Sequence, residues 1–414
     1  MSPEPALSSL RLGRRDLLRY AGLGAGMATL AACGVGGKGT KQATGTALSD
    51  EIKTFWAGKK KTGSVNWAQW PLYIDVGKNK GDHPSIDQFT SATGIKVHYS
   101  EPIQDTDTFF AKVQPSLSAG QYSGYDVAVI TNGVDFDKFK ELGLFVPLDH
   151  SYLTNFEKYA DPSYKRASYD PGNVYSVPWQ SGITGIAYNA KKVPKPLTSF
   201  FDLFNPALKG KVGMFADNQD LPNPCLVAMF GDPAKTGEAE WRKAATKLTQ
   251  QRDSGIVRKY YQQDYINALS DGDIWACQAW SGDIYQALAS GASDLVFAIP
   301  NEGAVLWTDN MVLLKHIEHA VDAMMLMDWY YQPKIAAEVA EYVNYITPVP
   351  AAKQVVLQDA AKASGSNKAA LQQVAKSPLV FPTAQDYSKL FRYRDLTNAE
   401  LNTWNSIFEP IYQS

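Results

Sequence analysis

The sequence predicts an α/β protein built of two lobes, and three observations support this. Short apolar runs typical of strands alternate with segments that have the apolar spacing of helices. This alternation begins near residue 64 and returns in the second half of the chain. The chain has 414 residues, 45% of them hydrophobic and 20% charged, and this length exceeds what one core usually organises. Strands that alternate with helices favour largely parallel sheets.

The expected elements of the first half follow one another at short intervals. A helix over residues 86–93 separates expected strands at 64–67 and 95–99, the second of which has alternating faces. A further helix over 106–119 begins at an Asp/Thr cap. Residues 126–131 then form a near-continuous apolar run, which is typical of a buried parallel strand.

The second half repeats this pattern and ends in helices. Strands are expected at 185–189, 211–215, 274–280 and 294–299. Helices are expected at about 238–252, 283–290, 318–332 and 334–342. Residues 350–414 have a mostly helical pattern, with a polar stretch near 362–368.

The first 32 residues have the pattern of an export signal. Arg-Arg-Asp-Leu-Leu-Arg at residues 14–19 resembles a twin-arginine signal, and an apolar run rich in small residues follows over 20–32. This run is too short, and too often interrupted by glycine, to span a bilayer. The Leu-Ala-Ala-Cys that ends at Cys33 resembles a bacterial lipobox, which predicts cleavage before Cys33 and a lipid on its thiol. We therefore expect export and anchoring on the outer face of the cytoplasmic membrane; the alternative is an ordinary cleaved signal.

The composition of the chain restricts the kinds of partner that it can bind. Residues 33–63 are rich in Gly, Thr, Lys and Ala, and predict a flexible tether. Beyond the signal the chain carries a net charge near −4, which argues against nucleic acid and is compatible with a cationic ligand. Two further cysteines, Cys225 and Cys277, could form a disulfide outside the cell or could be buried thiols.

Nine short stretches, in order over about 280 residues, resemble the polyamine-binding proteins of ABC transporters. They include Trp-Ser-Gly-Asp at 280–283 and Trp-Thr-Asp at 307–309. The others lie at 66–67, 93–97, 125–127, 173–178, 208–211, 300–304 and 345–348. The resemblance implies a type II periplasmic binding protein fold, in which each lobe is a mainly parallel sheet flanked by helices.

The resemblance also implies two hinge crossings between the lobes, near residues 182–184 and 307–310. The implied divisions are a signal at 1–32, a tether at 33–63, a first lobe at 64–183 and 308–350, and a second lobe at 184–307 and 351–414.

By the same resemblance, a cationic amine binds between the lobes. Its ammonium groups need carboxylates, and its methylenes need aromatic walls, which also attract cations. The implied carboxylates are Asp217, Asp220, Asp283 and Asp309, and the implied aromatic side chains are Trp67, Trp280, Trp307 and Tyr345. For each tryptophan the alternative is core packing, and for the acids it is capping or a solvated turn.

Three positions near this expected site bear on the ligand. Gln69 stands where the family usually carries an acid, so one end of the site is expected to be less acidic. Thr131 keeps a hydroxyl near a strand end, and Gly133 stands where some members carry an aromatic residue. A diamine, a longer polyamine and a monoamine-like cation therefore remain open as ligands.

Other functions have weaker support in the sequence. It contains no Gly-x-Ser-x-Gly, no phosphate-binding glycine loop and no His-Glu-x-x-His, so we expect no catalytic residue, cofactor or metal. His316 and His319 lack a clear third zinc ligand. The Tyr-Tyr pairs at 260–261 and 330–331 leave ferric-ion binding as an alternative, and sugar binding is another. The resulting hypothesis is a monomeric, lipid-anchored receptor that delivers a polyamine to the permease of an ABC importer.

Overall fold

The computed structural model describes residues 46–79 and 81–413. The expected signal, Cys33 and the start of the expected tether lie outside these ranges. Within them, no helix is both long enough and apolar enough to cross a membrane.

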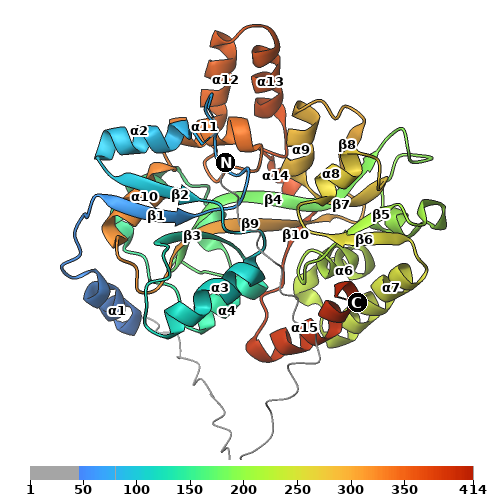
Figure 1. Ribbon diagram of the computed structural model, residues 1–414, viewed down its shortest axis with the longest axis horizontal. Helices are drawn as coiled ribbons and strands as arrows, with labels where there is room; N and C mark the ends of the chain where they lie inside the picture. Colours follow the sequence, from blue (N-terminus) through green and yellow to red (C-terminus); the bar gives the residue numbers. More distant parts are fainter. Residues whose placement is uncertain (1–45, 80, 414) are drawn as a thin grey trace, which may run out of the picture. The chain divides into compact units, whose positions relative to one another are not determined.

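The described strands form one mixed sheet of ten strands, which runs across Figure 1. Their order is β2-β1-β3-β9-β4-β7-β5-β6, with β10 beside β9 and β8 beside β4. The strands are β1 Ser64–Ala68, β2 Lys96–Ser100, β3 Val127–Thr131, β4 Ser176–Asn189, β5 Val212–Phe215, β6 Val257–Tyr261, β7 Ala276–Trp280, β8 Leu295–Ala298, β9 Ala304–Leu313 and β10 Leu390–Arg392.

Helices cover both faces of this sheet (Figure 1). Those that precede β7 are α1 Thr46–Trp56, α2 Pro84–Thr93, α3 Thr106–Ser118, α4 Val134–Glu141, α5 Thr154–Tyr159, α6 Pro222–Phe230, α7 Glu238–Asp253 and α8 Tyr265–Ser270. Those that follow it are α9 Ser281–Ala289, α10 Ala320–Trp329, α11 Pro333–Val343, α12 Ala352–Lys362, α13 Gly365–Lys376, α14 Ala384–Tyr387 and α15 Asn398–Tyr412.

The sheet contains two parallel groups of strands. In the first lobe β1 pairs in parallel with β2 and β3, and in the second lobe β5 pairs in parallel with β6 and β7. Separate hydrophobic clusters lie on the two sides, one around Trp67 and Phe89 and another around Trp241 and Trp404. These groups and clusters confirm the expected two-lobed α/β fold class.

Two long antiparallel strands, β4 and β9, join the two groups. The end of β9 pairs with β3, and the end of β4 pairs with β7. Between these pairings the two strands bond to each other, with Gly182 opposite Trp307. A Cβ at position 182 would lie 2.2 Å from the Trp307 ring, so a glycine is needed for this close approach. The expected crossings near 182–184 and 307–310 fall in this paired region.

The chain after residue 350 packs against both lobes. α12 and α13 pack against each other and α12 packs on α11, whereas α15 packs on α7. The hydrophobic cluster of the first lobe accordingly includes Val356 and Val374. This packing differs from the expected return of all of 351–414 to the second lobe. The exact lobe boundaries stay a prediction.

Part of the expected tether is a helix. α1 occupies Thr46–Trp56 because Ile52, Phe55 and Trp56 give one side of this segment an apolar surface. The Nε1 of Trp56 donates to the carbonyl of Pro147 at 2.9 Å, and its ring packs against Tyr152. This docking replaces the predicted flexibility of residues 46–56.

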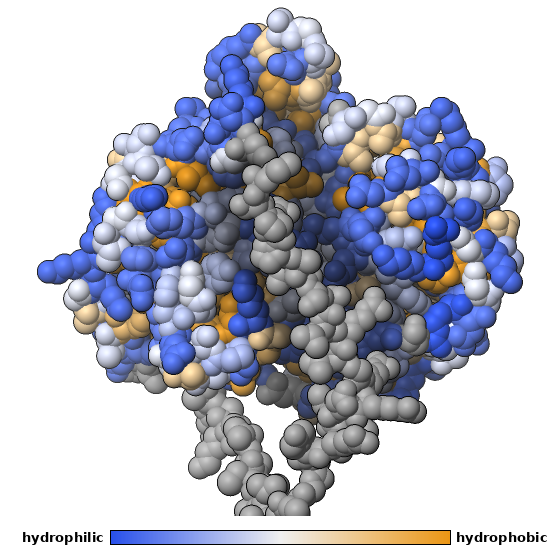
Figure 2. All heavy atoms as spheres, in the orientation of Figure 1, coloured by the Kyte–Doolittle hydropathy of each residue, from blue (hydrophilic) through white to orange (hydrophobic). Residues whose placement is uncertain are grey.

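Large hydrophobic side chains are mostly buried. On the face that Figure 2 shows, hydrophilic residues predominate and hydrophobic residues form scattered patches. The large hydrophobic side chains that are well exposed are Leu72, Val76, Leu142, Phe230 and Leu357. Of these, Leu72 lies in the cleft described next.

Candidate ligand-binding site

A cleft with about 460 Å³ of empty space, part of it open to solvent, lies where the two crossing strands pass between the lobes. Both lobes contribute to it: β3 and the loop after β1 from the first lobe, and α9 from the second. The residues that line it are Trp70, Pro71, Leu72, Tyr73, Thr131, Asp220, Gln263, Trp280, Asp283, Trp307, Asp309 and Tyr345.

Asp309 lies on β9 at the centre of the crossing. Its carboxylate accepts hydrogen bonds from Thr131 Oγ1 at 2.6 Å and from the Tyr73 hydroxyl at 2.7 Å. Burial raises the pKa of Asp309 to about 6, against the opposing effect of these two donors. Each carboxylate oxygen keeps one lone pair for a further donor.

Asp283 belongs to the first turn of α9, on the second lobe. It accepts from the Tyr345 hydroxyl at 2.8 Å and from the Tyr265 hydroxyl at 2.9 Å. Burial raises the pKa of Asp283 to about 6. Since Tyr345 follows α11, its hydrogen bond to Asp283 joins the two lobes across the cleft.

Asp220 is the third carboxylate of the cleft. It accepts from Thr184 Oγ1, from the Tyr393 hydroxyl and from Trp280 Nε1, at 2.6–2.7 Å. Burial raises its pKa. Asp217 lies in the same turn but does not line the cleft; its carboxylate accepts the backbone N–H groups of Gln219 and Asp220. Burial, and then the charge of Asp220, raise the pKa of Asp217 to about 7.

Four aromatic rings form a connected wall around these acids. Trp280 and Trp307 meet edge to face with ring centres 6.5 Å apart, and Trp307 packs on Tyr345 at 5.4 Å. Tyr345 in turn meets Tyr73 edge to face at 5.3 Å. The Trp280 ring is stacked on Phe215, which fixes its orientation from behind. Rings held in this way can cover methylene groups and attract cations.

Three residues of the expected site lie outside the cleft lining. Trp67 is fully buried and packs against Trp179, Tyr99 and Tyr330 in the first-lobe core. Gln69 is also fully buried, and its side-chain oxygen accepts from the backbone of Trp70. Asp217 is the third. The other expected residues, namely Thr131, Asp220, Trp280, Asp283, Trp307, Asp309 and Tyr345, all line the cleft.

The structure adds lining residues that sequence reasoning missed. Tyr73 donates to Asp309, and Trp70 is fixed by a bond from its Nε1 to the Val129 carbonyl. Leu72 has a φ of 58°, an unusual value for a residue with a side chain, and its side chain is well exposed at the cleft. The signal available in the sequence was the aromatic pattern Trp-Pro-Leu-Tyr directly after the first strand.

The charged side chains that line the cleft are all acidic. Among the described residues that line it are three carboxylates and no lysine, arginine or histidine. The donors to these carboxylates are neutral hydroxyl and indole groups, so the negative charge is oriented but not neutralised. Such a site favours a ligand that brings positive charge and N–H donors.

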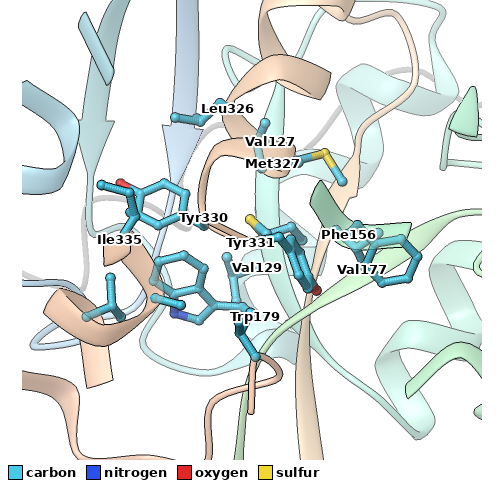
Figure 3. Packing of buried hydrophobic residues seen from close by; sticks show 14 of the residues in the cluster. Val127, Val129, Phe156, Val177, Trp179, Leu326, Met327, Tyr330, Tyr331 and Ile335 are labelled. Atoms are coloured by element: carbon cyan, nitrogen blue, oxygen red, sulfur yellow. The ribbon is translucent and has the colours of Figure 1, made fainter. Parts of the chain in front are cut away.

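The tyrosine pair at 330–331 has another role in the structure. Tyr330 and Tyr331 are buried beside Trp179 in the first-lobe core, as Figure 3 shows, and burial raises both of their pKa values. Their hydroxyls bond to Ser85 and to the Pro178 carbonyl. Deprotonation to an iron-binding tyrosinate is therefore disfavoured. The described residues contain no group of three or more His, Cys, Asp or Glu arranged to hold a metal ion.

The two cysteines of the body are not paired. Cys225 and Cys277 are free and buried, in different hydrophobic clusters. Burial raises the pKa of each thiol, that of Cys225 to about 12.

Comparison with known families identifies the class of this protein. Residues 85–373 match the family described as bacterial extracellular solute-binding protein. Because this match covers more than half of the chain, the chain belongs to that family.

Individual relatives show which members of this family the chain resembles. The spermidine/putrescine-binding periplasmic protein of Escherichia coli (strain K12) is 29% identical over 346 residues, which cover 83% of this chain and 89% of that protein. Among solved structures, a Listeria monocytogenes protein assigned to a spermidine/putrescine ABC transporter has a TM-score of 0.70 at 26% identity, and covers 84% of this chain and 99% of that one.

A lipoprotein of Treponema pallidum has a TM-score of 0.68 at 19% identity, with 85% of this chain and 100% of that one covered; it shares the fold. Together the relatives confirm the resemblance to polyamine-binding proteins of ABC transporters. The name of the Escherichia coli relative describes a binding protein, and that of the Listeria monocytogenes relative refers to an ABC transporter.

Proposed function

We propose that this protein captures a polyamine, or a similar small cationic amine, between its lobes and delivers it to the permease of an ABC importer. No chemical change of the ligand is part of this proposal. The observation that carries this proposal is the cleft itself. Asp220, Asp283 and Asp309 line it beside the aromatic wall, and none of the described residues that line it is basic.

The residues of the cleft fit the two parts of an amine. The open lone pairs of the carboxylates can accept from an ammonium group, and charge-assisted bonds of this kind are stronger than neutral ones. Trp280 and Trp307 would cover the methylene stem. The relatives that bind spermidine and putrescine support the same ligand class.

We also propose that the protein acts at the outer face of the cytoplasmic membrane. The signal pattern before Cys33 favours export and attachment through a lipid on that thiol, on the outer face of the cytoplasmic membrane. A relative with the same fold is a lipoprotein, and other relatives are periplasmic. A receptor held there can pass its ligand to a permease in the same membrane.

Isothermal titration calorimetry of the chain from residue 34 tests the ligand. Putrescine, spermidine and spermine are titrated at low salt, and micromolar or tighter binding of at least one is expected. The order of the three affinities shows whether the apolar lining residues Trp70, Pro71 and Leu72 favour a short amine. Absence of heat with all three, from folded protein, contradicts the amine assignment, and sugars and ferric ion are then titrated.

Asp309→Asn tests the site. The substitution removes one negative charge and keeps a hydrogen-bond acceptor for Thr131 or Tyr73. Amine affinity is expected to fall by about 1.5–3 kcal/mol, the size of a charge-assisted hydrogen bond. Asp217→Asn, measured at pH 8 where both carboxyl groups are ionised, is the control, since it removes a charge nearby but outside the cleft lining. Equal losses in the two variants would show that only overall charge matters.

A further inference from the structure

One residue of the cleft combines two features that normally lower stability. Leu72 has a φ of +58°, in the left-handed region that disfavours a bulky side chain. Its side chain is also 57% exposed, the highest value among the well-exposed large hydrophobic side chains of the described residues, and it lines the cleft. Backbone strain and apolar exposure at one position of a cleft point to a role of this side chain in binding.

The type of residue at this position is unusual for its conformation. Apart from glycines, three other described residues have a positive φ, and they are Asn173, His316 and Asn344. Asparagine and histidine adopt this conformation more readily than leucine does. If only the turn mattered, asparagine or glycine would form it at a lower cost. The use of leucine therefore indicates that the side chain itself is needed.

The neighbours of Leu72 fix the loop on both sides. Trp70 Nε1 donates to a backbone carbonyl of β3 at 3.0 Å, and the Tyr73 hydroxyl donates to Asp309 at 2.7 Å. The backbone carbonyl of Tyr73 accepts from Trp179 Nε1 at 3.2 Å. The position of Leu72 at the cleft is therefore set by its neighbours, while more than half of its own side chain stays uncovered.

The loop presents no charge to the cleft. Its lining residues are Trp70, Pro71, Leu72 and Tyr73, whereas the three lining carboxylates lie on β9, on α9 and in the turn after β5. An ammonium group placed against Leu72 would lose water without gaining a carboxylate of this loop. Methylene groups would instead cover exposed apolar surface, which is favourable. The loop therefore suits the uncharged part of an amine.

We propose that Leu72 is a specificity-determining residue, which covers the methylene chain of the ligand and excludes an ammonium group from the loop at 70–73. The ligand then places its ammonium groups at Asp220, Asp283 and Asp309 and extends no further charge along the loop. Putrescine fits this description better than spermidine or spermine, which carry additional ammonium groups. The inference rests on the proposed function and adds to it the length of amine that the cleft selects.

A charge placed at position 72 tests the exclusion. Calorimetry on the chain from residue 34 gives the affinities for putrescine and spermidine, and putrescine is expected to bind the unchanged protein more tightly. Leu72→Asp supplies an acceptor at the loop, so the ratio of spermidine to putrescine affinity is expected to rise about tenfold, the effect of one charge-assisted hydrogen bond. Val76→Asp is the matched control, because Val76 is exposed in the same segment but does not line the cleft. It adds the same charge and should leave the ratio unchanged.

Removal of the side chain separates binding from stability. Leu72→Gly and Leu72→Ala both remove the apolar contact, so each is expected to lower putrescine affinity about tenfold. Only glycine relieves the backbone, so the Gly variant should unfold at a higher urea concentration than the Ala variant. If Leu72 served only to stabilise the fold, both variants would unfold at lower urea concentration and bind putrescine with unchanged affinity.

Three results would overturn the role of Leu72 while amines still bind. They are an affinity ratio that changes equally in Leu72→Asp and Val76→Asp, full putrescine affinity in the Gly and Ala variants, and tighter binding of spermidine than of putrescine by the unchanged protein. Failure of the unchanged protein to bind either amine contradicts the proposed function itself, and the inference then falls with it.

Discussion

At the scale of single residues, the cleft keeps acids charged and oriented with neutral groups. Asp309 and Asp283 each accept from two hydroxyls, and Asp220 accepts from two hydroxyls and an indole. Neutral donors stabilise a carboxylate less than a guanidinium would, which is why burial still raises the pKa values. An arriving cation therefore supplies the stabilisation that the protein withholds.

These pKa values predict a pH dependence of amine binding. Asp283 and Asp309 have pKa values of about 6 instead of the ordinary 3.8, so below pH 6 a cationic amine must displace protons from them. Affinity for putrescine is expected to fall roughly 10- to 100-fold between pH 7.5 and pH 5. Calorimetry in buffers of different ionisation enthalpy should also detect proton release near pH 6.

The same groups affect stability in the opposite sense. Their raised folded-state pKa values mean that the folded chain binds more protons than the unfolded chain between about pH 4 and pH 6. The contribution of these two acids to stability without amine is therefore largest below that window and is lost as the pH rises through 6. The increase in Tm caused by amine should be larger at pH 7.5 than at pH 5. A pH-independent increase would contradict the role of these acids.

The sequence predicted all three carboxylates that line the cleft, but only some of its aromatic residues. Asp283, Asp309 and Asp220 stand in short recognisable motifs, whereas Tyr73 reaches Asp309 from 236 positions away. No local pattern could reveal that pairing. Trp67 was predicted for the wall, yet β1 lies between β2 and β3 and its Trp67 ring faces the first-lobe core. The next aromatic residue along, Trp70, lines the cleft instead.

At the scale of elements, regular short segments were predictable and the long crossing strands were less so. The strands expected at 64–67, 95–99 and 126–131 lie within one or two residues of β1, β2 and β3. The first half of β4 and all of β9 were not predicted as strands. Both are buried along their full length and are interrupted by polar residues, Ser, Gln, Thr and Asn in β4 and Thr, Asp and Asn in β9, so they show neither alternation nor a long apolar run.

Helix α1 gives a prediction at this scale. Trp56→Ala should lower the free energy of unfolding by about 3 kcal/mol, because a buried indole and its bond to Pro147 are lost. Trp56→Phe keeps the ring contact with Tyr152 and should cost about 1 kcal/mol. Urea unfolding of the chain from residue 34 measures both. Equal midpoints for all three proteins would show that α1 is not docked in solution.

At the scale of the whole molecule, a folded body follows an N-terminal segment that the sequence marks for export. The resemblance to solute-binding proteins predicted the fold class from motifs scattered over the chain. It could not predict that α12 and α13 pack beside α11, because their composition fits either lobe. Long-range packing of this kind depends on shape rather than on local sequence pattern.

Attachment to the membrane is the prediction at this scale. Cys33→Ser in the full chain removes the proposed lipid acceptor, so the protein should move from the membrane fraction to the soluble extracytoplasmic fraction. Cys225→Ser is the matched control and should stay with the membrane, because the Cys225 thiol is buried in the second lobe. Immunoblots of fractionated cells measure both. Retention of Cys33→Ser in the membrane fraction would contradict the lipid anchor.

The pairing of β4 with β9 restricts how the lobes can move. Two strands bonded side by side can flex together as one ribbon, but sliding one along the other would break several hydrogen bonds at once. The register shift between Pro178 and Gln180 is the one interruption in this ribbon, and it lies beside Asp309. Movement between the lobes should therefore follow a single bending direction with its softest point next to the central carboxylate. A receptor that bends in one direction would adapt to ligands of different length through its side chains and through the angle of this single bend.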